Sequence, residues 1–188
     1  MRKIMSMRIA VISAVAGLMS LGAGLQAADN ATETKPERGE LSRKDYKFAR
    51  DASQANLLEV RLGEIAKQKA ANPTVQQFGD QMIKDHTKAN DQLKQIASKK
   101  GAVLPEQLTR REESEFEHLQ KLSGKDFDKA YAARMVKDHQ KDIKEFQDAT
   151  KTLTDPDLKD FAQKTLPTLE HHQQMAQQIE SSVKTQEP

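Results

Sequence analysis

The sequence predicts an all-α protein, a ferritin-like four-helix bundle with a helical crossover between its second and third long helices. Apolar residues recur at steps of three and four over four long segments, which is the spacing of one buried stripe per helix. Two Asx-Pro pairs, Asn72-Pro73 and Asp155-Pro156, interrupt these segments as tight turns do. Helices of matched length joined by tight turns indicate two antiparallel hairpins.

The first hairpin is predicted from its capping residues. Ser42, with Asp45 three residues later, opens a first helix that extends to residue 71. Asn72 then caps a second helix, which has Pro73 in its first turn and ends near residue 100. A turn this short brings the two helices side by side.

The link between the hairpins is too long for a tight turn. Residues 101–125 include a segment that begins at Pro105 and is expected to be helical over 105–122. At 1.5 Å per residue such a helix is roughly 27 Å long. It can therefore cross the length of the bundle, which would set the second and third long helices parallel.

The second hairpin repeats the devices of the first. Asp126 is expected to cap a third long helix that ends near residue 153. Asp155 and Pro156 then open a fourth helix, which is expected to fray near residue 182. The two hairpins together account for the four long helices.

Glycine and proline inside these helices have expected roles. Gly63 and Gly79 lie about equally far from the first turn, so they should face each other and allow close packing. Pro167 lies within the fourth helix and removes one backbone hydrogen bond. It either kinks that helix or marks a boundary between two segments, and the sequence leaves both possibilities open.

The N-terminal segment has the composition of a secretory signal peptide. An uncharged run over 9–25 follows a basic start and precedes small residues, so we expect cleavage after residue 27 and a periplasmic location. Residues 28–41 are expected to form a flexible leader, residues 42–184 the four-helix bundle, and residues 185–188 a disordered tail. After signal cleavage we expect no membrane span.

Composition excludes several classes of function. The signal segment carries three of the 30 basic residues, so the remaining chain has 27 basic against 28 acidic side chains. That balance leaves no basic field for nucleic acid, and any partner is expected to be a protein or a small ligand. The chain has no cysteine, which excludes disulfides, thiol catalysis and thiolate metal ligands. No nucleotide-binding or nucleophile motif is present, so an enzyme is not the favoured interpretation.

A seven-residue motif occurs twice and points to a possible site. Met-Ile-Lys-Asp-His-Thr-Lys at 82–88 returns as Met-Val-Lys-Asp-His-Gln-Lys at 135–141. The chain has five histidines, and this motif places His86 and His139 in matching helical contexts. Their spacing from neighbouring apolar residues puts both imidazoles on the buried stripes of their helices.

The predicted hairpins bring two further residues to the same level of the bundle. Glu59 falls level with His86, and His172 falls level with His139, each near the middle of its helix. Inward carboxylate and imidazole groups are how helical bundles build metal sites. The hypothesis is a single divalent ion, zinc or another first-row metal, at Glu59, His86, His139 and His172.

The two aspartates of the repeated motif point about 100° away from their histidines on the helical wheel. Asp85 and Asp138 are therefore interpreted as supports behind the metal ligands. They can equally be partners of Lys88 and Lys141, three residues further along each helix.

A metal-free interpretation stands beside this hypothesis. Buried histidines bonded to polar groups often only stabilise a core, so the protein can also be an envelope or stress-related interaction module. A di-iron centre is not expected, because the Glu-x-x-His spacing of such bundles is missing. The residues three before the histidines are Ile83, Val136 and Leu169.

The order and spacing of these residues resemble the bacterial "domain of unknown function 4142" family over about residues 42–180. The resemblance implies an exported, ferritin-like helical domain and brings no established reaction. Members are often labelled outer-membrane proteins. It is carried by Ala55-Asn56, Glu59, Leu62-Gly63, Phe78-Gly79, Met82-Ile83, Asp85-His86, Phe127-Asp128, Met135-Val136, His139, Leu166-Pro167-Thr168-Leu169 and His172.

Overall fold

The computed structural model describes residues 40–185, which form five α-helices and no β-strand. The expected signal peptide, most of the expected leader and residues 186–188 lie outside the described residues. None of the described helices is long and apolar enough to cross a membrane. The helices are α1 (Arg43–Lys69), α2 (Pro73–Lys99), α3 (Arg110–Gln120), α4 (Gly124–Thr152) and α5 (Pro156–Thr185).

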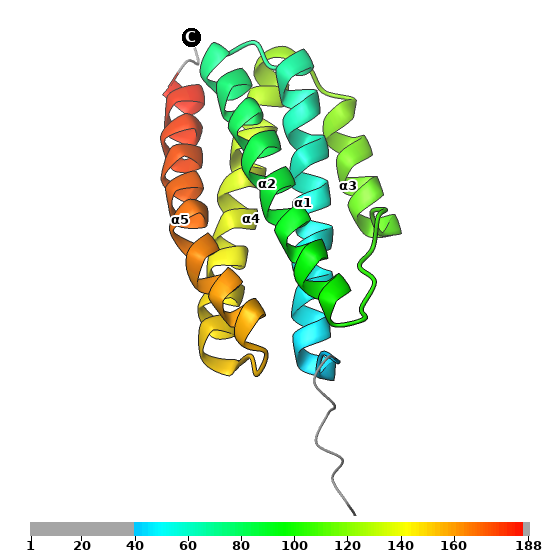
Figure 1. Cartoon of the computed structure of the whole chain (residues 1–188). Helices are drawn as coiled ribbons and strands as arrows, with labels where there is room; N and C mark the ends of the chain where they lie inside the picture. The colour runs from blue at the N-terminus through cyan, green and yellow to red at the C-terminus, as the bar shows by residue number, and fades with distance from the viewer. Residues whose placement is uncertain (1–39, 186–188) are drawn as a thin grey trace, which may run out of the picture. The chain divides into compact units, whose positions relative to one another are not determined.

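The four long helices form two hairpins that pack on each other (Figure 1). α1 packs along α2, and α4 packs along α5. The hairpins meet through α2 with α5 and through α1 with α4, while α3 lies against α1 and α4. In Figure 1 the colour order shows that α2 and α4 run in the same direction, as a crossing connector requires.

The predicted helix caps are present at the starts of α1, α2 and α5. The side chain of Ser42 accepts a hydrogen bond from the amide of Asp45 at 3.1 Å. Asn72 Oδ1 accepts from the amide of Thr74 at 2.8 Å, which confirms the cap at the start of α2. Asp155 Oδ1 accepts from the amide of Leu158 at 3.0 Å at the start of α5. These bonds satisfy amides that have no partner within the helix.

Each hairpin turn is also held by an aspartate from the other hairpin. Asp128 of α4 accepts from the amides of Ala71 and Asn72, at 3.2 and 2.9 Å. Asp45 of α1 accepts from the amide of Thr154 at 3.0 Å and also from its hydroxyl. The two turns are thereby tied to the opposite half of the bundle.

The crossover helix is shorter than the sequence predicts. α3 begins after Thr109 instead of at Pro105, because Thr109 and Glu112 form a reciprocal capping box. The amide of Thr109 donates to Glu112 at 2.7 Å, and the amide of Glu112 donates to Thr109 Oγ1 at 3.3 Å. The residues before it are not helical, and Leu104 among them is buried in the core.

The start of α4 differs from the prediction, and the structure distinguishes the two interpretations of Pro167. α4 begins at Gly124 and not after Asp126, because the amide of Phe127 already donates to the carbonyl of Ser123, at 3.4 Å. Pro167 lies inside a continuous α5, so the interpretation as a helix boundary is wrong. In Figure 1 the orange part of α5 is inclined to its red part, as a proline within a helix produces.

The two helical glycines face each other across α1 and α2, as predicted. A Cβ on Gly63 would lie 2.6 Å from the carbonyl oxygen of Gly79. A Cβ on Gly79 would lie 2.9 Å from the carbonyl oxygen of Gly63. Only residues without a side chain permit this approach of two backbones.

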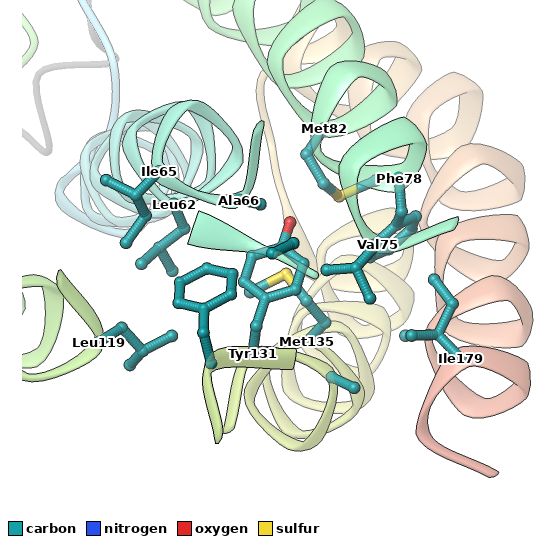
Figure 2. Close-up of a cluster of buried hydrophobic side chains, with 14 of the residues drawn as sticks. Leu62, Ile65, Ala66, Val75, Phe78, Met82, Leu119, Tyr131, Met135 and Ile179 are labelled. Atoms are coloured by element: carbon teal, nitrogen blue, oxygen red, sulfur yellow. The ribbon is translucent and has the colours of Figure 1, made fainter. Parts of the chain in front are cut away.

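The apolar core consists of two clusters with a polar layer between them. One cluster lies toward the α1–α2 turn, and Figure 2 shows side chains from all five helices meeting there. The other lies toward the α4–α5 turn and includes Leu93, Phe146 and Leu169. On α2 the last buried residue of the first cluster is Met82, and the first buried residue of the second cluster is Leu93. Buried polar residues fill the interval on every long helix: Ser53, Asn56 and Glu59, His86 and Asn90, His139 and Asp142, and His172.

Candidate metal centre

Three imidazoles from three helices meet in the polar layer. His86 of α2, His139 of α4 and His172 of α5 are each at most 4 % exposed. Their ring centroids are 5.3 to 5.6 Å apart. One ring nitrogen of each lies within 4.8 Å of a ring nitrogen of the other two. The repeated motif thus supplies two members of the group and α5 supplies the third.

Each ring is held by one hydrogen bond to an acceptor. His86 Nδ1 lies 2.8 Å from Oδ1 of Asn56 on α1. His139 Nδ1 lies 3.0 Å from the carbonyl oxygen of Met135, one turn earlier on α4. His172 Nε2 lies 2.9 Å from Oδ2 of Asp85 on α2. The partners are all oxygen acceptors, so in each ring the bonded nitrogen carries the proton and donates.

This pattern of bonds leaves one lone pair free on each neutral ring. The remaining nitrogens are Nε2 of His86, Nε2 of His139 and Nδ1 of His172. All three are buried and have no hydrogen-bond partner among residues 40–185. An imidazole that donates from one nitrogen and presents the other is in the form that binds a metal.

The surroundings keep these rings neutral. Burial, and then the nearby His139 and His172, hold the pKa of His86 well below its usual value. Burial, and then His172, lower the pKa of His139 to about 4, although its bond to Met135 opposes this. Burial also lowers the pKa of His172, against the opposing effect of Asp85. Neutral rings carry the lone pairs that a cation requires.

Glu59 is buried at the same level but on another side of the layer. Its carboxylate oxygens are not among the candidate ligand atoms that lie within 4.8 Å of one another, which all belong to the three histidines. Its side chain lines a small cavity of about 60 Å³ together with Asp138 and Asp142 of α4. Burial, and then the charges of these two aspartates, raise the pKa of Glu59 well above its usual value.

The supporting aspartates of the repeated motif differ in their contacts. Asp85 contacts His172 and also accepts from Gln81 Nε2, at 2.5 Å. Asp138 pairs with Arg134, which also donates to Glu115 of α3 at 2.8 Å. Asp85 therefore fixes a ring, whereas Asp138 belongs to the charged network around Glu59.

Asn56 has a role that the sequence analysis did not assign. It supplies the acceptor for His86 from α1, and it is 6 % exposed. A signal was present, because Asn56 lies three residues before Glu59 and seven before Gly63 on the buried stripe of α1. The remaining two histidines, His118 and His171, are exposed.

Comparisons with other proteins agree on the type of domain. A family model described as "Domain of unknown function (DUF4142)" matches residues 30–179. The crystal structure of a DUF305 fragment from Deinococcus radiodurans is similar, with a TM-score of 0.68 and 12% sequence identity. The likeness covers 76% of this chain and 99% of that chain, and at such identity it shows the fold alone. No curated protein matches this chain.

Proposed function

The chain belongs to the DUF4142 family, and we propose that it binds one divalent transition-metal ion through His86, His139 and His172. Two observations carry this proposal: the three buried imidazoles converge, and each of them has one ring nitrogen without a hydrogen-bond partner among the described residues. Buried polar atoms are rarely left without a partner, and three together in one place call for a cation.

The ligand geometry suits zinc and related ions. Zinc binds imidazole nitrogen at about 2.0–2.1 Å, so the nitrogens of a tetrahedral site are about 3.4 Å apart. Three imidazoles and no thiolate favour zinc, copper or nickel. Since the present separations are at most 4.8 Å, side-chain movements of about 1 Å complete the site.

Glu59 remains a proposed fourth ligand or a neighbour of the site. Its Oε2 is buried and has no hydrogen-bond partner among residues 40–185. The carboxylate of Glu59 does not lie with the three ring nitrogens, so a movement of α1 or of the side chain is needed to bring it to the ion. The variant Glu59→Gln tests whether Glu59 is a ligand. If it is, the variant should lose at least about tenfold in zinc affinity.

Titration of the full chain with zinc, followed by calorimetry, tests the proposal. We expect one ion per chain, and an affinity at least about 100-fold lower in His139→Gln than in the wild type. His118→Gln is the matched control, since it changes an exposed histidine and should leave the affinity unaltered. Circular dichroism establishes that each variant is folded. No stoichiometric binding, or equal binding by both variants, would exclude the metal site.

The metal-free alternative has its own supporting observation. The three rings pack against one another and against Phe78, whose ring centroid is 6.2 Å from that of His172. Such packing and the single bond of each ring are enough to order a polar layer in an envelope interaction module. This alternative predicts that His139→Gln lowers the free energy of unfolding while zinc has no effect on either protein.

We further propose that the domain acts in the periplasm and is ferritin-like in its connections. The basic start and the uncharged run over 9–25 support export, and fractionation of cells expressing the tagged chain tests it. The common direction of α2 and α4 and the connecting α3 support the ferritin-like class. Superposition of an experimental structure on ferritin-like bundles tests that class.

A further inference from the structure

A cleft between α2 and α5 leads from solvent to two of the three imidazoles. Its volume is about 290 Å³, and His86 and His172 lie among its lining residues. Lys88 and Lys164 line it as well and are exposed, so they lie at its rim. The small cavity on the α1–α4 side is lined by Glu59 and by none of the three histidines. Of these two hollows, the α2–α5 cleft is therefore the one that adjoins histidines of the proposed site.

The charge around the proposed ion is incomplete. With Glu59 beside Asp138 and Asp142 and not on the ion, the three neutral imidazoles are its only protein ligands. They leave its two positive charges uncompensated and a fourth coordination position open. Asp85 is the carboxylate that lines the cleft, and it is already bonded to His172 and Gln81. An anion in the cleft would supply both the missing ligand and the missing charge.

The cleft offers groups that recognise such an anion. Lys88 and Lys164 supply positive charge from the two helices that form its walls. Lys164 is also 2.7 Å from the exposed Asp160, a contact that water screens. The hydroxyl of Thr168 and the amide of Gln92 line the same cleft and can donate to oxygen atoms.

We infer that this cleft binds a small oxyanion, a carboxylate or a phosphate, as the fourth ligand of the metal ion, with Lys88 and Lys164 holding its outer oxygens. A volume of about 290 Å³ suits an anion of a few heavy atoms. The inference rests on the proposed metal site and specifies what that site takes up. It makes the domain a metal-dependent binder of small anions.

Cobalt substitution separates the anion site from the metal site. The full chain is loaded with Co²⁺, and its visible absorption is recorded while acetate or phosphate is added at constant ionic strength. We expect a saturable spectral change with one of the two anions or with both. Response to acetate alone identifies a carboxylate site, and response to phosphate alone identifies a phosphate site.

The lysines are tested with a matched pair of double variants. Lys88→Ala with Lys164→Ala should raise the half-saturating anion concentration about tenfold and leave the Co²⁺ affinity within about twofold. Lys84→Ala with Lys184→Ala removes the same charge from exposed positions on the same two helices and should change neither. A cobalt spectrum that does not respond to anions, or responds equally in both double variants, overturns the anion site alone. Absence of cobalt binding overturns the metal site and this inference with it.

Discussion

Nε2 of His172 on α5 lies 2.9 Å from Oδ2 of Asp85 on α2, so one carboxylate joins the two hairpins and orients an imidazole. This bond leaves Nδ1 of His172 as the free nitrogen of that ring. Asp85→Asn removes the charge that favours the donating tautomer. We expect zinc affinity to fall about 10- to 100-fold, as measured by calorimetry. Asp91→Asn, an exposed change on the same helix, should have no effect, and equal losses in both variants would contradict this role.

Metal binding should release fewer protons at pH 6 than three ordinary histidines would. The pKa of His139 is lowered to about 4, and those of His86 and His172 also lie below the usual 6.5. Each ring is therefore neutral at pH 6 more often than a free histidine, and His139 in particular has almost no proton to lose. Three unperturbed histidines would release about two protons at this pH. Calorimetry in two buffers of different ionisation enthalpy counts the protons, and a value near two would show that the apo site is protonated.

Asp142 should make the fold less stable as the pH rises. Burial raises its pKa to about 7, helped by Asp138 and Glu145 and opposed by Lys141 and Arg134. Since the folded-state pKa exceeds the unfolded value of 3.8, the native state holds a proton that the unfolded chain loses in this window. The stability contribution of Asp142 is therefore lost as the pH rises from 3.8 to about 7.

Asp142→Asn should accordingly stabilise the protein at pH 8 by roughly 1–3 kcal/mol and have little effect at pH 4. Urea unfolding at the two pH values measures the difference. Asp148→Asn, an exposed change on the same helix, serves as the control. A variant that is destabilised at pH 8 would mean that Asp142 is a favourable ion-pair partner there.

Gly79→Ala should destabilise the fold although alanine favours helices. The added Cβ would lie 2.9 Å from the carbonyl oxygen of Gly63 and 2.9 Å from the Cβ of Ala66. Forcing the helices apart costs about 1–3 kcal/mol, which exceeds the gain in helix propensity of about 1 kcal/mol. Thermal unfolding followed by circular dichroism measures the loss. The control Ser98→Ala, exposed on the same helix, should shift the stability by less than about 0.5 kcal/mol, and an equally stable Gly79→Ala would contradict the close contact.

Much of the fold is predictable because the turns carry strong local signals. Asn72 and Asp155 each precede a proline and cap the following helix, and the structure contains both bonds. The connector is harder to predict, since Pro105 and Thr109 both offer plausible helix starts. The reciprocal bonds of Thr109 with Glu112 favour the later start, and the preceding segment gains burial of Leu104 instead.

The sequence predicts the position of the candidate site along the bundle axis, but it predicts only part of the side-chain orientations. Counting from the turns brings His86, His139 and His172 to one layer, because helical rise fixes the position along the axis. It does not fix the rotation of α1. Asn56 and Glu59 are three residues apart, which turns them about 60° from each other on the helix. Asn56 consequently contacts His86, while Glu59 lies beside Asp138 and Asp142 of α4.

Anomalous diffraction from a zinc-soaked crystal tests the central claim most directly. The account predicts one zinc peak per chain inside the bundle, about 2.0–2.1 Å from Nε2 of His86, Nε2 of His139 and Nδ1 of His172. Asp85 and the carbonyl of Met135 should keep their bonds to the opposite nitrogens of their rings. A structure with no internal peak, or with zinc only at the exposed His118 or His171, would contradict it.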